Sequence, residues 1–100
     1  MPIIYHVTPA SEWNKAKEKG FYDTPSLNEE GFIHCSQEQQ IAGVLQRYFA
    51  DQTGLVKLVI DTDKLKSRFV FDWSPSVHDT FPHIYGPINI DAVIDVIAIN

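Results

Sequence analysis

Six short apolar segments, none longer than eight residues, limit the fold that this chain can adopt. They cover residues 3–8, 31–35, 55–60, 68–73, 83–85 and 92–99. Most are bounded by glycine, proline or polar residues, a pattern typical of β-strands. Only two segments show helical periodicity, both in the first half of the chain, and residues 21–30 between them are predicted to be a polar connection. This order predicts an α+β fold, with a mixed or mainly antiparallel sheet and two main helices packed on it.

The two helical segments carry end signals as well as apolar periodicity. The first is predicted to stop at Gly20, and Thr8 or Ser11 can cap its start. The second is predicted to begin at Ser36, which has capping-box spacing with Gln39. Its apolar positions recur at the spacing of one helix face: Ile41, Val44, Leu45, Tyr48 and Phe49.

The composition is typical of a small cytoplasmic protein. One hundred residues with 44% hydrophobic side chains suit one domain, residues 1–100, around one core. A single cysteine excludes an internal disulfide framework and fits a reducing cytoplasm, and neither a signal peptide nor a membrane span is expected. The net charge of −5 disfavours broad nucleic-acid binding, although one small acidic ligand can still be held. The oligomeric state stays open.

The segment EGFIHCS places His34 beside Cys35, the only cysteine of the chain. Side chains alternate between the two faces of a strand, so these neighbours point apart and His34 cannot activate Cys35 as a nucleophile. Cys35 is therefore expected to be a small buried residue. Ser36 is expected to cap the following helix, and it can also line a pocket at the mouth of that helix, where backbone N–H groups favour anions.

Three of the predicted strands each present one histidine beside a hydroxyl group. The residues expected to share a face are His6 with Thr8, His34 with Ser36, and His83 with Tyr85. One such histidine is usually a hydrogen-bonded core residue, but three in 100 residues favour a shared polar pocket. Three imidazoles and a water can also hold zinc, although no HxH or HxxxH spacing places two ligands on one element.

The segments YHVT, GFIHCS, FPHIYGPI and AVIDV, in this order, resemble a small bacterial family known as domain-of-unknown-function family 952. The resemblance extends from Ile3 to about Val96. That family is similar in fold to the ADP-ribosyltransferases, which include the tRNA 2′-phosphotransferases. Those enzymes hold NAD or an ADP-ribose-like intermediate in the cleft of a split mixed sheet. The resemblance therefore implies an ADP-ribosyltransferase-like split sheet with a nucleotide-binding cleft.

Individual positions match the motifs of these enzymes. His6-Val7-Thr8 resembles their His-Gly-Thr motif, in which the histidine contacts a ribose and the backbone of the central residue holds the nicotinamide amide. Val7 replaces the glycine but still supplies its N–H and C=O. Ser36 matches the small hydroxyl residue that ends the second cleft strand, and His34 is the counterpart of a histidine in the 2′-phosphotransferases.

The third motif differs from that of the transferases. Most of them orient the nucleophile with a late glutamate, and here only Asp72, one methylene shorter, occupies a comparable position. The 2′-phosphotransferases use arginines instead, of which this chain has only Arg47 and Arg68.

Three functional hypotheses follow. The leading one is a pocket that binds or cleaves NAD or a related nucleotide as a transferase, with His34, His6 and Asp72 as catalytic candidates. A histidine would carry a proton or bind the ribose, and Tyr85 would stack on a nicotinamide or adenine ring. The predicted binding residues are His6, Val7, Thr8, Ser36, His83 and Tyr85. The alternatives are a non-catalytic binding or accessory module on the same fold and a metal-dependent hydrolase with a three-histidine site.

Overall fold

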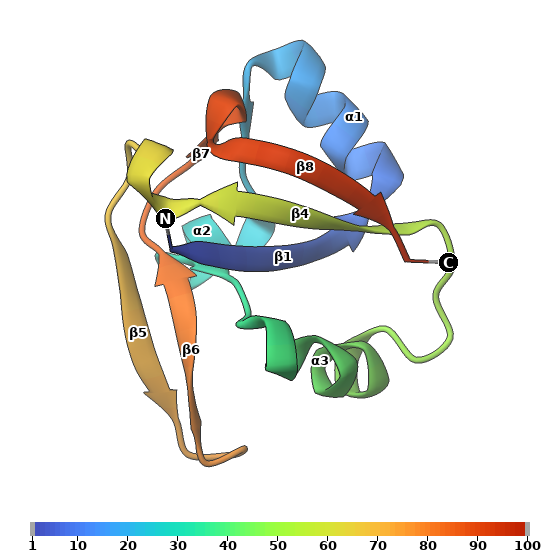
Figure 1. The fold of residues 1–100 in the computed structure, drawn as a ribbon, viewed down its shortest axis with the longest axis vertical. Coiled ribbons are helices and arrows are strands. Elements are labelled where there is room, and N and C mark those ends of the chain that lie inside the picture. Colours follow the sequence, from blue (N-terminus) through green and yellow to red (C-terminus); the bar gives the residue numbers. More distant parts are fainter. Residues whose placement is uncertain (1, 100) are drawn as a thin grey trace.

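Two three-stranded antiparallel sheets and one pair of very short strands make up the β-structure of the computed structural model, which describes residues 2–99 (Figure 1). The first sheet has the order β1-β4-β8, from β1 (Ile3–Pro9), β4 (Leu55–Asp61) and β8 (Val93–Ala98). The second has the order β3-β6-β5, from β3 (Ile33–His34), β6 (Asp79–Ile84) and β5 (Phe69–Ser74). The short pair consists of β2 (Phe21–Tyr22) and β7 (Ile88–Asn89). All strand pairs within residues 2–99 are antiparallel, and the predicted α+β class is confirmed.

Within residues 2–99, three α-helices and three single turns of 3₁₀ helix connect the strands. The α-helices are α1 (Ala10–Lys19), α2 (Pro25–Glu29) and α3 (Ile41–Tyr48). The 3₁₀ turns are η1 (Glu38–Gln40), η2 (Thr62–Lys64) and η3 (Ile90–Ala92). Gly20 ends α1 in a left-handed conformation with φ +97°, as its glycine predicts. The predicted cap at Thr8 or Ser11 is wrong, because the chain enters α1 through Pro9 without a side-chain cap.

The second helix does not begin at Ser36. The backbone of Ser36 pairs with Tyr5 of β1 in a two-bond bridge, Tyr5 N to Ser36 O at 2.9 Å and Ser36 N to Tyr5 O at 2.7 Å. Ser36 is therefore extended, and the capping box forms one residue later between Gln37 and Gln40. The predicted cap is wrong because a strand 31 residues away in sequence uses the backbone groups of Ser36.

The stretch at residues 21–30 is more than a polar connection. It contains β2 and α2, and Tyr22 in β2 is 2% exposed. A two-residue strand has no periodicity that a sequence pattern can reveal. Tyr22, like Ile88 of its partner strand β7, is therefore a core residue that the sequence analysis missed.

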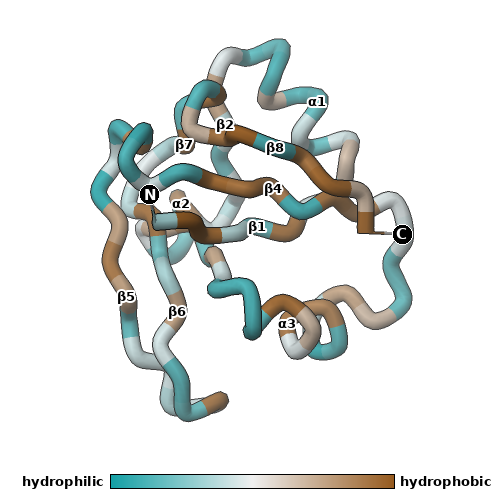
Figure 2. The backbone as a smooth tube through the Cα atoms, viewed as in Figure 1, coloured by the Kyte–Doolittle hydropathy of each residue, from teal (hydrophilic) through white to brown (hydrophobic). Residues whose placement is uncertain are grey.

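The core lies on the inner face of the β1-β4-β8 sheet. Alternate residues Leu58 and Ile60 of β4 point to this face and are fully buried, together with Ile4 of β1. Trp13 and Ala16 of α1 pack into the same cluster, so α1 covers this face. Figure 2 shows the corresponding concentration of hydrophobic residues along β4 and β8.

Helix α3 contributes less to this core than its apolar pattern suggests. None of its residues is fully buried, and Tyr48 is 65% exposed. In Figure 1 it lies at a distance from the first sheet, next to the β5-β6 hairpin. Its apolar side borders a cavity instead of a close-packed interior.

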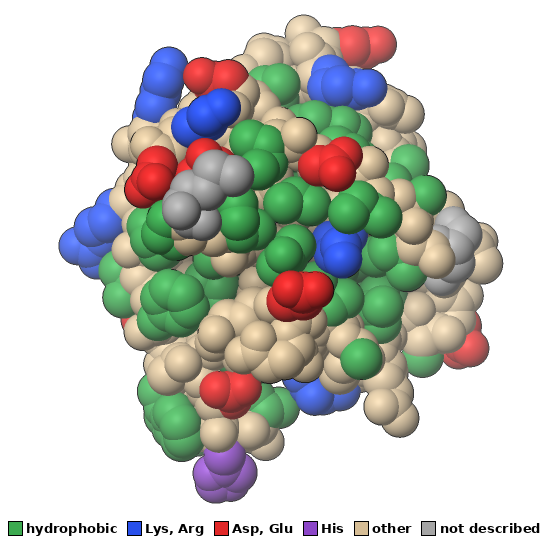
Figure 3. Space-filling view, in the orientation of Figure 1, with side chains coloured by type: hydrophobic (Ala, Val, Ile, Leu, Met, Phe, Trp, Pro, Cys, Tyr) green, Lys and Arg blue, Asp and Glu red, His purple; other side chains and the backbone are tan. Residues whose placement is uncertain are grey.

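Part of the apolar surface remains exposed along the edge strand β8. Ile94, Val96 and Ile97 are each 37–41% exposed. Figure 3 shows hydrophobic side chains gathered on the face where β8 and β4 run. Within residues 2–99, no helix is both long and apolar enough to cross a bilayer.

The difference in burial predicts unequal costs for the same substitution in the two regions. Leu58→Ala should lower the free energy of unfolding by about 2–5 kcal/mol, since it removes a fully buried side chain. Leu45→Ala in α3 should cost less than about 1.5 kcal/mol, because Leu45 is only half-buried and alanine favours the helix. Urea unfolding of both variants tests this. Equal losses would mean that α3 is part of the close-packed core.

Candidate functional site

His6 of β1 lies at the junction of three strands. Its neighbour across the sheet is Leu58, so its side chain points to the core face that it shares with Thr8. The Nδ1–H donates to the backbone carbonyl of His34 at 2.6 Å, and Nε2 lies 2.7 Å from the hydroxyl of Tyr22. The same hydroxyl is hydrogen-bonded to Thr8 at 2.9 Å. One imidazole therefore connects β1 to both β2 and β3.

Burial keeps His6 neutral. It lowers the pKa of His6 from 6.5 to about 4, an effect that the hydrogen bond to the His34 carbonyl only partly offsets. A neutral imidazole that donates through Nδ1 has an unprotonated Nε2, which lies beside the Tyr22 hydroxyl, while Tyr22 donates its own proton to Thr8. Both ring nitrogens are thus engaged inside the protein. His6, predicted as a proton carrier and ribose ligand, is placed where it can fix the position of β3.

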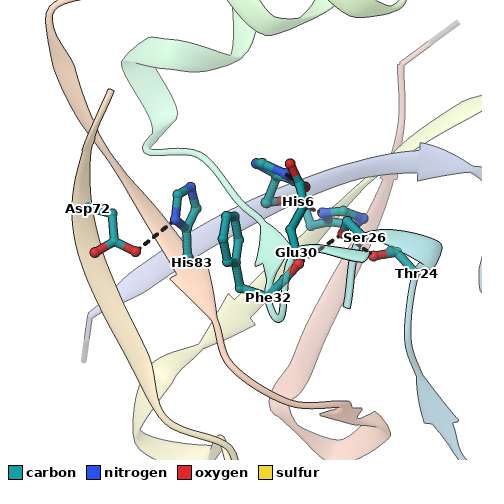
Figure 4. A network of polar contacts seen from close by, with 8 residues as sticks. His6, Thr24, Ser26, Glu30, Phe32, Asp72 and His83 are labelled. Atoms are coloured by element: carbon teal, nitrogen blue, oxygen red, sulfur yellow. Dashed lines mark hydrogen bonds and ion pairs between the residues drawn. The ribbon is translucent and has the colours of Figure 1, made fainter. Parts of the chain in front are cut away.

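His34 of β3 and His83 of β6 form one wall of the site. They are direct cross-strand partners. The next two residues along the strands, Cys35 and Pro82, are joined by the hydrogen bond from Cys35 N to Pro82 O. His34 and His83 therefore form a non-hydrogen-bonded pair, the type in which the side chains lie closer together. Their ring centroids lie 5.1 Å apart at an interplanar angle of 77°. Phe32 stacks on His83 with centroids 4.1 Å apart, which restricts the His83 ring (Figure 4).

Each of the two histidines has a carboxylate partner. Nδ1 of His83 lies 2.8 Å from the Asp72 carboxylate, and Nε2 of His34 lies 2.6 Å from that of Glu30. Hydrogen bonds lower the pKa of Asp72, with the larger effect from Tyr85 and the next from His83, so Asp72 stays ionised. The His83 side chain is 13% exposed and that of His34 is 54% exposed. Figure 4 shows the Asp72–His83 pair side by side with Phe32.

A cavity of about 590 Å³ opens in front of the two histidines. Its lining comes from β1, the Glu30–Ser36 segment, α3 and the β5-β6 hairpin. Apolar and aromatic residues supply most of the lining: Val7, Val44, Tyr48, Phe49, Trp73, Pro75, Val77 and Phe81. The polar lining residues are His6, Glu30, His34, Ser36, Ser74 and His83, and Cys35 also contributes. No lysine or arginine of residues 2–99 is part of this lining.

The sequence-predicted residues fall into two groups. His6, Val7, His34, Ser36 and His83 border the cavity. The other three do not border the cavity. Thr8 is hydrogen-bonded to Tyr22 in the interior, and Tyr85 donates a hydrogen bond to Asp72, which is itself the partner of His83.

The neighbour of His34, Cys35, is not a catalytic nucleophile or a metal ligand. Cys35 is buried, and burial raises the pKa of its thiol far above the ordinary range, so it remains protonated. In the described part of the chain, no group of three or more His, Cys, Asp or Glu side chains is arranged to hold a metal ion. The three-histidine hydrolase is therefore not supported.

Sequence reasoning missed Glu30 and Tyr22. Glu30 precedes the GFIHCS motif and lies four residues before His34, but it is outside any long helix, so spacing alone does not indicate the contact. Tyr22 lies in a polar stretch with no strand periodicity. The face shared by His6 and Thr8 was predicted correctly, but it points to the core.

The lowered pKa of His6 predicts how stability depends on pH. Between pH 6.5 and about 4 the unfolded chain binds a proton at His6 and the folded chain does not. Stability from this group is therefore fully present above pH 6.5 and falls as the pH drops, by up to about 3 kcal/mol. His6→Gln should cost about 1–3 kcal/mol at pH 7, and its difference from wild type should shrink towards pH 4. Urea unfolding from pH 7 to 4 measures this, with His78→Asn at an exposed histidine as control. A constant difference across this range would contradict a buried neutral His6.

Comparison with known proteins agrees with the resemblance in the sequence. The family described as "Protein of unknown function (DUF952)" matches residues 7–96. The crystal structure of protein CC0527 from Caulobacter crescentus is similar, with 27% identity and a TM-score of 0.85 over 95% of this chain and 83% of that chain. The solution NMR structure of CC0527 has 27% identity and a TM-score of 0.79 over 100% of this chain and 86% of that chain. No curated protein matches the chain. Because the family match spans most of its length, the chain belongs to the DUF952 family of proteins of unknown function.

Proposed function

We propose that the cavity binds NAD or a related nucleotide, with the base among the apolar walls and the ribose at His34 and His83. The observation that supports this most is the cavity itself, whose about 590 Å³ lies within the range of small-molecule sites. It combines a mainly apolar and aromatic lining with a few polar groups gathered at one end. An aromatic base linked to a hydroxyl-rich sugar has the same division into apolar and polar parts.

The distribution of charge supports a particular orientation of the ligand. Glu30 is the only Asp, Glu, Lys or Arg among the described lining residues, so anionic phosphates are disfavoured inside. Arg47 borders a second hollow of about 200 Å³, which shares Val77 and Phe81 with the cavity. Within residues 2–99 Arg47 makes no ion pair. Phosphates that extend towards Arg47 would leave the base and ribose in the cavity.

The resemblance to ADP-ribosyltransferases supports a nucleotide as the ligand, but two of the matching residues have other roles in this protein. His6 and Asp72, two residues predicted to do chemistry, are engaged within the protein. This observation favours, as a second candidate, a non-catalytic module that binds the same ligand. The two candidates share the ligand and differ only in turnover.

A thermal-shift titration with NAD and, separately, ADP-ribose tests the proposal. Ligand at 100 times its dissociation constant should stabilise the protein by about 2.7 kcal/mol, a shift of several degrees. The fluorescence of Trp73, an exposed residue that borders the cavity, should change with the same midpoint, because the other tryptophan, Trp13, is buried in the core. The absence of both signals at millimolar ligand would refute nucleotide binding.

His34→Ala should weaken this binding about tenfold while the protein stays folded, since one polar contact to the ligand is worth about 1–1.5 kcal/mol. Its side chain is half exposed, so little stability should be lost. His78→Asn, outside the cavity lining, is the matched control and should bind as wild type does. If His34→Ala instead binds normally, the ribose does not lie at the histidine wall.

A further inference from the structure

We propose that His34 and His83 act as a base and an acid that hydrolyse the N-glycosidic bond of a riboside in the cavity, with Glu30 and Asp72 as positioning residues. The inference rests on the proposed function, because the substrate must first bind there. It goes further by naming the reaction, the reacting nitrogen atoms and a residue, Glu30, that the sequence analysis did not find.

The hydrogen bonds select one nitrogen on each ring. Asp72 accepts the proton of His83 Nδ1, which leaves Nε2 of His83 for a substrate. Glu30 accepts the proton of His34 Nε2, which leaves Nδ1 of His34. Neither remaining nitrogen is hydrogen-bonded to a side chain or backbone group of residues 2–99. Carboxylates that fix imidazoles in this way are a recurrent feature of acid–base sites.

The two pairs have unequal surroundings, and this assigns their roles. His83 is nearly enclosed, stacked on Phe32, and held by an Asp72 that stays ionised and can stabilise a positive imidazolium. His83 is therefore the acid. The His34–Glu30 pair is about half exposed, so His34 can meet a water molecule and is the base. The ring centroids lie only 5.1 Å apart, which allows the two histidines to act on the same glycosidic bond.

The reaction balances with water as the only co-reactant. The water oxygen forms a bond to C1′ of the ribose, and its proton passes to Nδ1 of His34. The bond from C1′ to the base nitrogen breaks, and its electron pair stays on the base. A base that is uncharged in the riboside, such as adenine, takes the proton from Nε2 of His83 and leaves as a neutral molecule. The nicotinamide of NAD is positively charged in the riboside and leaves neutral without this proton. Proton exchange with solvent then restores both histidines.

The charges favour this reaction over cleavage of a phosphate ester. Glycoside hydrolysis passes through an oxocarbenium-like centre that carries positive charge. Glu30 and Asp72 lie on the two sides of the histidine pair and stabilise such a charge. Phosphoryl transfer spreads negative charge over oxygen atoms, which needs cations, and the described lining holds no lysine or arginine.

The test uses two substrates that differ in their leaving group. Adenosine releases adenine, which must be protonated as it leaves, whereas NAD releases nicotinamide, which leaves neutral without a proton. Release of each base by the full chain is measured by chromatography, and binding of both probes is measured separately by thermal shift. Wild type should release both bases. His34→Gln should lower both rates by about 10²-fold or more, because water activation is common to the two reactions.

Variants of His83, the acid, and of its partner Asp72 should affect the two release rates unequally. His83→Gln and Asp72→Asn should lower adenine release by about 10²-fold but change nicotinamide release less than about threefold. Asp72→Glu, which restores a carboxylate, should regain part of the adenine rate, and His78→Asn should match wild type. Circular dichroism and urea unfolding confirm that each variant is folded, and Glu30→Gln provides a second, exposed variant that should lower both rates.

Each contrary result has a distinct meaning. Binding of both probes without release of either base would overturn the acid–base pair while leaving the proposed binding function intact. No binding would overturn the binding function itself. Equal losses of adenine and nicotinamide release in folded Asp72→Asn would overturn its role as the group that positions the acid.

Discussion

The buried imidazole of His6 is the interaction on which the rest of the structure depends. It donates to the backbone of β3 and lies within hydrogen-bond distance of the Tyr22 hydroxyl of β2, while its own strand pairs with β4 in the first sheet. The Tyr5–Ser36 bridge lies beside it and joins the same two sheets through the backbone. Loss of the imidazole would remove one partner of the buried Tyr22 hydroxyl and the partner of the partly buried His34 carbonyl, and buried polar groups that lose a partner are costly.

This junction explains why the two sheets form a cavity at their border instead of one continuous sheet. Within residues 2–99, backbone pairing between them is limited to one bridge, after which the second sheet diverges as the β5-β6 hairpin (Figure 1). The apolar side of α3 closes part of the resulting space without filling it. Stability therefore comes mainly from the β1-β4-β8 sheet and α1, and the less densely packed half is available for a ligand.

Local patterns in the sequence predicted the α+β class and the end of α1 at Gly20, because these depend on neighbours along the chain. They did not predict the extended Ser36, whose backbone partner Tyr5 is distant in sequence. Strand alternation assigned His6 to the correct face but could not indicate that this face is the core. The partnership of Glu30 with His34 depends on the turn after α2, which Gly31 marks in the sequence, but a turn signal does not indicate which side chains meet across it.

Histidine side-chain ¹⁵N NMR during a titration with NAD tests the account most directly, since it observes the four imidazoles separately. The account predicts that His6 stays neutral with its proton on Nδ1 from pH 7 to 5. It also predicts that NAD shifts the signals of His34 and His83 and leaves those of His78 unchanged. A His6 that takes up a proton near its ordinary pKa of 6.5 would contradict the structural role of His6, and shifts that appear only at His78 would contradict the site at the histidine wall.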